Sequence, residues 1–193
     1  MNEAESKYWD RIAESLTDNV WKRAEIVKRL LSLDLYDKDV LEIGTGLGTA
    51  AGALNVVLIG RWRYKGTDIS KKNCELVRNA FRLETVQTGI TDLPFPDASF
   101  DVVFALDTLE HVRPEERMKG YSEIDRVLKP SGTVAINIPL EETQHDLDFD
   151  HGFLPNDLYA IWSVCKLSPE TYETYAAKLP DEVRYYAWAV GVR

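Results

Sequence analysis

Val40-Leu41-Glu42-Ile43-Gly44-Thr45-Gly46-Leu47-Gly48 is the stretch that decides the fold of this chain. Its first four residues are mostly apolar, which is typical of a strand buried in a parallel sheet. Three glycines then follow at every second position, and glycine permits tight turns and the close approach of a ligand. A helical pattern begins at Thr49, and a helix N-terminus favours negatively charged groups. The stretch therefore predicts a nucleotide-like cofactor at the first strand-to-helix turn of an α/β fold.

Composition narrows the class of protein. The 193 residues are 45% hydrophobic and 28% charged, as in a globular domain. No apolar run approaches the roughly 20 residues of a membrane span, so we expect no membrane partner. The polar, acidic start is unlike a signal peptide, and Cys74 and Cys165 lack metal or disulfide spacing, so a cytoplasmic location is expected. The net charge of −9 argues against a nucleic-acid partner, which rewards clustered Lys and Arg.

Strand and helix patterns alternate along the chain. Strands are predicted at 40–43, 64–68, 84–88, 101–105 and 133–138, and near 171–176 and 183–191. Helices are predicted over 5–33 with a break at 17–19, and over 49–59, 71–82, 114–128 and 156–166. This order predicts a Rossmann-like, doubly wound, mostly parallel sheet of about seven strands, the last antiparallel, with helices on both faces. We expect one domain of 1–193, with a helical cap (1–35), a cofactor-binding core (38–139) and a substrate-side loop, helix and final strands (140–193).

Residues after the first two strands narrow the choice of cofactor. A nicotinamide site would have its third glycine at position 49, where Thr49 stands, and no lysine follows for a phosphate-binding P-loop. Asp68 ends the second predicted strand, where a carboxylate can accept hydrogen bonds from both hydroxyls of a ribose. Ile69 would offer an adenine an apolar face. Asp68 could instead cap the next helix, although Ser70 is better placed for that role.

Several segments together resemble a known family. Glu42–Gly48 and Asp68 resemble motif I and the second-strand acid of the class I S-adenosylmethionine-dependent methyltransferases. Three further segments are similar to the type-11 subgroup: LPFPDASFD at 93–101, LEHV at 109–112 and RVLKPSG at 126–132. Together the matches cover about residues 38–139 in the family's order and spacing. Two positions depart from the pattern: Gly89 replaces an Asp that usually binds the adenine amino group, and Ser131 replaces a glycine before the fifth strand.

The resemblance implies S-adenosylmethionine as cofactor and S-adenosylhomocysteine as product. It also implies roles for eleven residues in three parts of the site. Around the methionine portion these are the backbone of Gly44, Thr45, Gly46 and Gly48, with Glu42 beneath it; at the ribose and adenine they are Asp68, Ile69 and the backbone of Ile90 and Thr91; on the methyl-donor side they are Ala105 and Leu106.

A protonated acceptor would also need a base. His111 is one candidate, because its segment follows the fourth strand and an imidazole titrates near neutrality. It could instead start a helix or pack at the sheet edge. Asp107, Glu110 and His111 have a spacing that would align them on one helical face, where they could hold a divalent metal. No fourth ligand is evident, so we assign no metal site.

The region after the fifth predicted strand corresponds, by the resemblance, to a segment that often covers the substrate in related enzymes. His151 with Phe153 is similar to a His–aromatic pair found there in related enzymes, although a solvated acidic loop is the alternative, and the better one for His145. Tyr8 and Trp9 on the first helix could form a facing lid, with core packing equally open for Trp9.

The leading prediction is a methyltransferase acting on a small molecule, for which a hydroxyl is a reasonable acceptor. The sequence leaves the acceptor and the oligomeric state open. The residues after the fourth strand, Phe104–Thr108, do not form the DPPY or NPPY segment of DNA base methyltransferases. Two alternatives stay open: a non-catalytic S-adenosylmethionine-binding module, which Gly89 favours, and an RNA or protein methyltransferase with a broad cleft.

Overall fold

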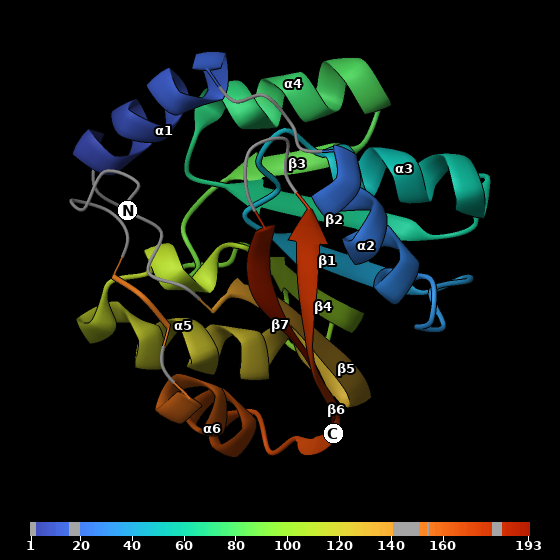
Figure 1. The fold of residues 1–193 in the computed structure, drawn as a ribbon, viewed down its shortest axis with the longest axis vertical. Coiled ribbons are helices and arrows are strands. Elements are labelled where there is room, and N and C mark those ends of the chain that lie inside the picture. The colour runs from blue at the N-terminus through green and yellow to red at the C-terminus, as the bar shows by residue number, and fades with distance from the viewer. Residues whose placement is uncertain (1–2, 16–19, 141–150, 154, 179–182) are drawn as a thin grey trace.

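The chain folds around one seven-stranded sheet, seen in a computed structural model that describes residues 3–15, 20–140, 151–153, 155–178 and 183–193 (Figure 1). The strand order is β3-β2-β1-β4-β5-β7-β6. The strands are β1 (Asp39–Ile43), β2 (Arg63–Asp68), β3 (Glu84–Gln87), β4 (Phe100–Leu106), β5 (Leu128–Pro139), β6 (Ser168–Lys178) and β7 (Val183–Val192). β7 runs antiparallel to both of its neighbours, β5 and β6, whereas β1 to β5 pair in parallel. The predicted sheet, with its antiparallel last strand, is therefore confirmed.

Helices cover both faces of the sheet. They are α1 (Glu3–Ser15), α2 (Val20–Leu30), α3 (Thr49–Leu58), α4 (Lys71–Phe81), the 3-10 turn η1 (Leu109–His111), α5 (Pro114–Val127) and α6 (Pro155–Val164). Figure 1 shows α2, α3 and α4 on one side of the sheet and α5 and α6 on the other. The predicted break at 17–19 lies outside the described residues.

Two apolar cores fill the space between the sheet and these helices. On one face, Leu30, Leu54 and Val77 are completely buried against the sheet. On the other face, Tyr121 of α5 and Ile161 of α6 are equally buried. The central strands are buried almost without interruption, as expected for parallel strands covered on both sides. Helices packed on both faces hold the parallel strands in place, so that their carboxyl ends lie along one edge of the sheet. The glycine turn follows β1 at this edge.

The fifth strand begins earlier than the predicted residue 133. Leu128 pairs with Phe100, and the register then shifts before Val102 pairs with Thr133. Residues 129–132 (Lys, Pro, Ser and Gly) lack large apolar side chains, so a hydrophobicity pattern does not detect this part of the strand. Ser131 within it has φ +62°, a left-handed conformation that favours glycine.

Candidate functional site

The glycine turn after β1 is shaped by three glycines with positive φ. Gly44, Gly46 and Gly48 have φ of 72°, 52° and 70°. A Cβ on Gly44 would lie 2.4 Å from Thr108 Oγ1, and one on Gly48 would lie 2.5 Å from a methyl of Val77. A Cβ on Gly46 would meet no atom within 4 Å. Gly44 and Gly48 are thus required by packing, whereas Gly46 borders open space that a ligand can enter.

Asp68, at the end of β2, lies directly against this turn. Its Oδ2 accepts a hydrogen bond from the Gly46 N–H at 2.8 Å, and its Oδ1 accepts one from the Ser70 N–H at 2.8 Å. Asn73 Nδ2 also donates to Oδ2, at 3.3 Å. Burial raises the pKa of Asp68, while these hydrogen bonds oppose the rise. Three of about four acceptor positions of the carboxylate are used, which leaves capacity for a ribose hydroxyl.

Ser70 is the residue that caps α4, as the sequence predicts. Its Oγ accepts a hydrogen bond from the Asn73 N–H at 3.1 Å. Asp68 is therefore left to hold the glycine turn rather than to cap the helix.

Glu42 is buried within β1, below the turn. Its Oε2 accepts a 2.6 Å hydrogen bond from the hydroxyl of Tyr64 on β2. Burial and the neighbouring Glu42 charge raise the pKa of Tyr64, which keeps the phenol protonated and donating. The pair supports the strand ends from beneath the position where the methionine portion is expected.

The residues expected around the adenine follow β2 and β3. Ile90 is buried against Gly120 of α5, and Thr91 is half-buried. Within the described part of the chain, the N–H groups of Ile90 and Thr91 donate to no other group. These donors, the open space at Gly46 and the carboxylate of Asp68 fit the chemistry of an adenosyl cofactor.

The end of β4 leads to a buried polar network. The side chains of Ala105 and Leu106 lie in the cores, so that only their backbone groups can serve a ligand. Asp107 has φ +51°, and its N–H donates to the Asn137 carbonyl at 2.8 Å. Asn137 Nδ2 donates to Asp107 Oδ1 at 2.7 Å, and the Tyr175 hydroxyl donates to Asn137 Oδ1 at 2.7 Å.

Sequence reasoning missed Asn137 and Tyr175. A fully buried asparagine in an otherwise apolar strand was the one signal that could have drawn attention to the first.

His111 lies at the end of the single turn η1. Its Nε2 is 3.9 Å from Oε1 of Glu110, and its ring is 4.8 Å, centroid to centroid, from that of Trp9 on α1. Contrary to the prediction, Asp107 does not share a helical face with Glu110 and His111, because Asp107 has a left-handed backbone and precedes this single turn. Among the described residues, no group of three or more His, Cys, Asp or Glu side chains could hold a metal ion.

Residues 151–153 lie against η1 and α5. The His151 N–H donates to the Glu110 carbonyl at 2.9 Å. Arg117 of α5 donates to the carbonyl of Gly152 and pairs with Asp157 of α6 at 2.7 Å. The Arg117 guanidinium carbon also lies 5.8 Å from the centroid of the Phe153 ring. The predicted His–aromatic pair is thus held beside the His111 turn, while His145 lies outside the described residues.

Helix α1 connects the adenine side of the site with the His111 side. Ser6 Oγ donates to the Ile69 carbonyl at 2.8 Å, and Ser70 Oγ donates to Asp10 at 2.6 Å. Glu5 pairs with Arg113 at 2.5 Å, next to the His111 turn. These polar contacts, together with the Trp9 ring, place α1 across the ends of the strands, in keeping with the predicted lid.

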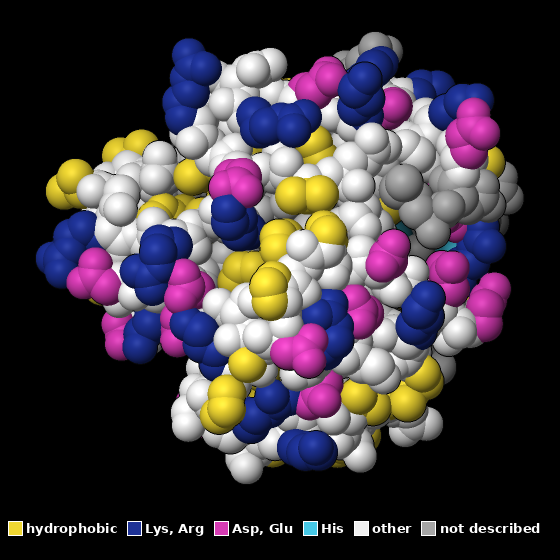
Figure 2. All heavy atoms as spheres, turned by 180° about the vertical axis from the view of Figure 1, so that it is seen from behind, with side chains coloured by type: hydrophobic (Ala, Val, Ile, Leu, Met, Phe, Trp, Pro, Cys, Tyr) yellow, Lys and Arg dark blue, Asp and Glu magenta, His cyan; other side chains and the backbone are white. Residues whose placement is uncertain are grey.

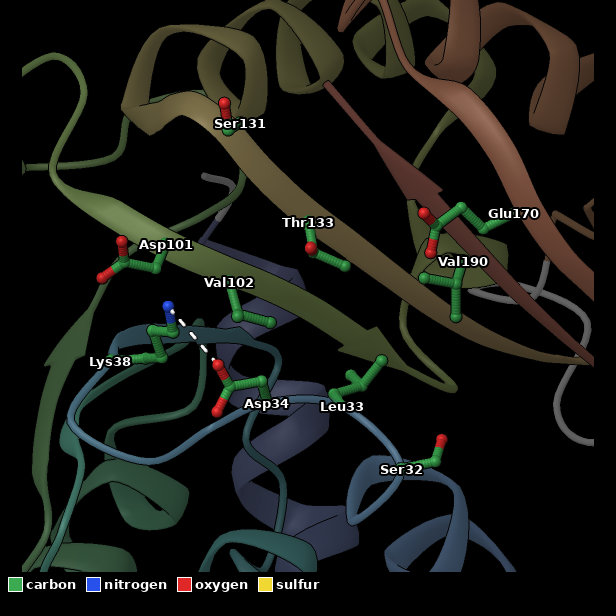
Figure 3. A pocket seen from close by; sticks show the side chains of 10 residues that line it. All are labelled: Ser32, Leu33, Asp34, Lys38, Asp101, Val102, Ser131, Thr133, Glu170 and Val190. Atoms are coloured by element: carbon green, nitrogen blue, oxygen red, sulfur yellow. Dashed lines mark ion pairs between the residues drawn. The ribbon is translucent and has the colours of Figure 1, made fainter.

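A separate surface pocket lies at the opposite ends of the strands (Figure 3). It has a volume of about 230 Å³, and its lining includes Lys38, Asp101, Thr133 and Glu170. Lys38 pairs with Asp34 across its mouth at 3.6 Å. Ligands of doubly wound folds bind at the carboxyl ends of the strands, so this pocket is not where methyl transfer is expected.

The sequence of this chain matches a known family of domains. Residues 41–136 match the family model described as a methyltransferase domain of type 11. Residues 41–136 therefore belong to this family of methyltransferase domains, and relatives named as S-adenosylmethionine-dependent methyltransferases agree with the sequence motifs.

Two curated relatives and one solved structure show the range of similar proteins. A Mycobacterium tuberculosis (strain CDC 1551 / Oshkosh) protein, named a probable S-adenosylmethionine-dependent methyltransferase, is 32% identical over 63% of this chain and 43% of its own length. The 27-O-demethylrifamycin SV methyltransferase of Amycolatopsis mediterranei is 30% identical over 67% of this chain and 48% of its own length. The chain thus spans less than half the length of these relatives.

Among solved structures, a chain from the complex between the Haloferax volcanii Trm112 methyltransferase activator and the "putative methyltransferase" has a TM-score of 0.78. The two chains are 21% identical, and the superposition covers 95% of this chain and 96% of the other. This likeness shows the fold.

Proposed function

We propose that the chain transfers the methyl group of S-adenosylmethionine to a hydroxyl of a small molecule. The observation that carries the proposal is the pairing of open space at Gly46 with the buried Asp68 carboxylate bonded to the same residue. One side of that pairing admits a ligand, and the other offers an acceptor to a ribose. The relative from Amycolatopsis, named for a demethylated rifamycin, supports a small molecule and an oxygen as acceptor.

The bound cofactor would supply an electrophilic methyl group, so the protein's task is to position the acceptor and exclude water. Trp9 and His111 form an aromatic wall at the end of the strands, closed on one side by α1. Residues 151–153 close another side, through the hydrogen bond from His151 to Glu110. We propose that the acceptor binds beside these elements.

His111 is the proposed general base. It is about one-quarter exposed, with 28% of its side-chain surface accessible, so an acceptor hydroxyl can reach it. The Glu110 carboxylate, 3.9 Å from Nε2, would stabilise the imidazolium formed when the hydroxyl loses its proton. We propose His151 as a second acceptor contact on the facing segment.

Surface charge favours a small molecule over RNA. On the face shown in Figure 2, Lys and Arg side chains are interspersed with Asp and Glu rather than gathered in a basic stripe. The net charge of −9 acts in the same direction. None of the helices that the structure describes has the length and hydrophobicity needed to cross a bilayer.

Three experiments test the proposal. Calorimetry with S-adenosylmethionine and S-adenosylhomocysteine tests the cofactor: binding is expected, and no binding to either would refute the enzyme. A screen of hydroxyl-bearing small molecules that detects S-adenosylhomocysteine release tests the acceptor. With an acceptor found, His111→Asn should lower kcat by about 10²- to 10⁴-fold, the usual contribution of a general base. Affinity for S-adenosylhomocysteine should stay within about twofold, because the ring does not face the adenosyl group in this assignment.

The non-catalytic module is the alternative that one residue favours. Gly89 removes the carboxylate that the family usually presents to the adenine amino group. This alternative predicts cofactor binding without product release for any acceptor, and a productive screen would exclude it.

A further inference from the structure

The position of Gly89 raises the question of which group recognises the adenine amino group in this chain. A neutral hydrogen-bond acceptor is sufficient, because an amino group donates. Gln87, at the end of β3, lies two residues before Gly89 and therefore on the same side of an extended chain. It is also the direct cross-strand partner of Asp68 in the register of β2 and β3. Gln87 thus lies next to the residue proposed to hold the ribose.

The amide of Gln87 is held in one orientation although its side chain is exposed. Its Nε2 donates to the Ile69 carbonyl at 3.0 Å and to Ser6 Oγ at 3.3 Å. A backbone carbonyl only accepts hydrogen bonds, so the group that meets it must be the NH₂ end of the amide. Ser6 donates to the same carbonyl at 2.8 Å, which ties helix α1 to this amide. Fixing a long exposed side chain costs conformational entropy, which a ligand-binding role would justify.

The oxygen of the same amide is available. Within the described part of the chain, Gln87 Oε1 accepts no hydrogen bond. This oxygen can accept a hydrogen bond from the adenine amino group while the NH₂ end stays bound to Ile69 and Ser6. We propose that Gln87 recognises the adenine amino group of the cofactor in place of the missing carboxylate at position 89, with Ser6 as its positioning residue. This inference rests on the proposed cofactor site.

The test compares two ligands that differ at the amino group. Calorimetry measures the affinities for S-adenosylhomocysteine and for S-inosylhomocysteine, which carries an oxygen instead. The wild-type protein should prefer the adenosyl compound. Gln87→Met should lower affinity for it by about tenfold, the effect of one hydrogen bond, and leave the inosyl compound within about twofold. Ser6→Ala should shift the ratio in the same direction by a smaller factor.

Two further variants separate recognition from structure. Gly89 is not among the described glycines with positive φ, so a side chain there meets no left-handed backbone strain. Gly89→Asp in the Gln87→Met background should restore the preference for the adenosyl compound by returning an acceptor to the family's usual place. Glu84→Met, at the other end of β3, is the control and should leave the ratio unchanged.

The outcomes are distinct. If the wild type binds neither ligand, the cofactor site itself is refuted. If it binds both and Gln87→Met changes the melting temperature but not the ratio of affinities, Gln87 only anchors α1 and the inference is overturned.

Discussion

The backbone N–H of Gly46 donates to Oδ2 of Asp68 at 2.8 Å, and so joins the turn after β1 to the end of β2. One carboxylate therefore shapes the glycine turn and is also the residue proposed to bind the ribose. The affinity for cofactor and the stability of the turn are coupled through this side chain, and they can be separated by substitution and by pH.

Replacing Asp68 should weaken cofactor binding more than the loss of a neutral contact. Asp68→Ala removes a charged acceptor, and hydrogen bonds to charged groups are worth about 1.5–3 kcal/mol each. Calorimetry with S-adenosylhomocysteine measures the effect, with circular dichroism as the check on folding. Asp68→Asn keeps one acceptor oxygen and should fall between the wild type and the alanine variant. A folded alanine variant with unchanged affinity would contradict the ribose assignment.

The same carboxylate should make the cofactor-free protein less stable as pH rises. Burial raises the pKa of Asp68 in the folded state above its usual 3.8, so the folded protein holds this proton more tightly than the unfolded chain. Stability contributed by this group is therefore lost as pH increases from 3.8 through the folded pKa. Asp68→Asn, which does not titrate, should remove that part of the pH dependence in urea unfolding. An identical profile in the variant would show that the carboxylate is not desolvated.

Glycine substitutions should separate binding from backbone strain. Gly46→Ala places a methyl group in open space at φ +52°, and a side chain at such φ costs about 1–3 kcal/mol of folding free energy. It should also obstruct the cofactor. Gly60→Ala is a matched control, since Gly60 has φ +69°, equally open surroundings and a place at the end of α3. Equal loss of S-adenosylhomocysteine affinity in the two variants would remove Gly46 from the site.

Ser131 offers a stabilising substitution. Its φ of +62° is strained for a serine, and left-handed backbone costs an L-residue about 1–2 kcal/mol. Ser131→Gly should therefore raise the free energy of unfolding by about 1 kcal/mol, less the added entropy of the unfolded glycine. Chemical denaturation measures the change. A destabilised variant would mean that the serine side chain makes a contribution larger than the strain.

The ion pairs at the opposite end of the strands should make the protein less stable as pH falls, which is the reverse of the effect expected for Asp68. Hydrogen bonds from Arg63 and Lys129 hold the pKa of Asp39 well below its usual 3.8. The stability this group contributes is present above 3.8 and is lost as pH falls towards its folded pKa. Asp39→Asn should be less stable than the wild type at neutral pH, and the difference should shrink on acidification. A difference that stays constant with pH would argue against this ion pair as the cause.

Most of the fold was predictable because its signals are local. Apolar runs bounded by glycine identified β1, and the Asp68-Ile69-Ser70 segment identified the end of β2 and the start of α4. The start of β5 was not predictable, because it depends on pairing with Phe100 and on a serine in a left-handed conformation. Asn137, Tyr175 and Gln87 were missed for the same physical reason. Their roles arise from contacts between distant segments, and no spacing along the chain encodes them.

The insertion of β7 between β5 and β6 has a consequence for the order of folding. β6 has β7 as its only partner in the sheet, and β7 comes later in the chain. β6 therefore joins the sheet only through β7, whose own pairing with β5 is non-local. The five parallel strands, β1 to β5, pair with one another and all precede β7 in the chain. During synthesis, the strands proposed to hold the methyl donor therefore emerge before β6 and β7, which complete the sheet.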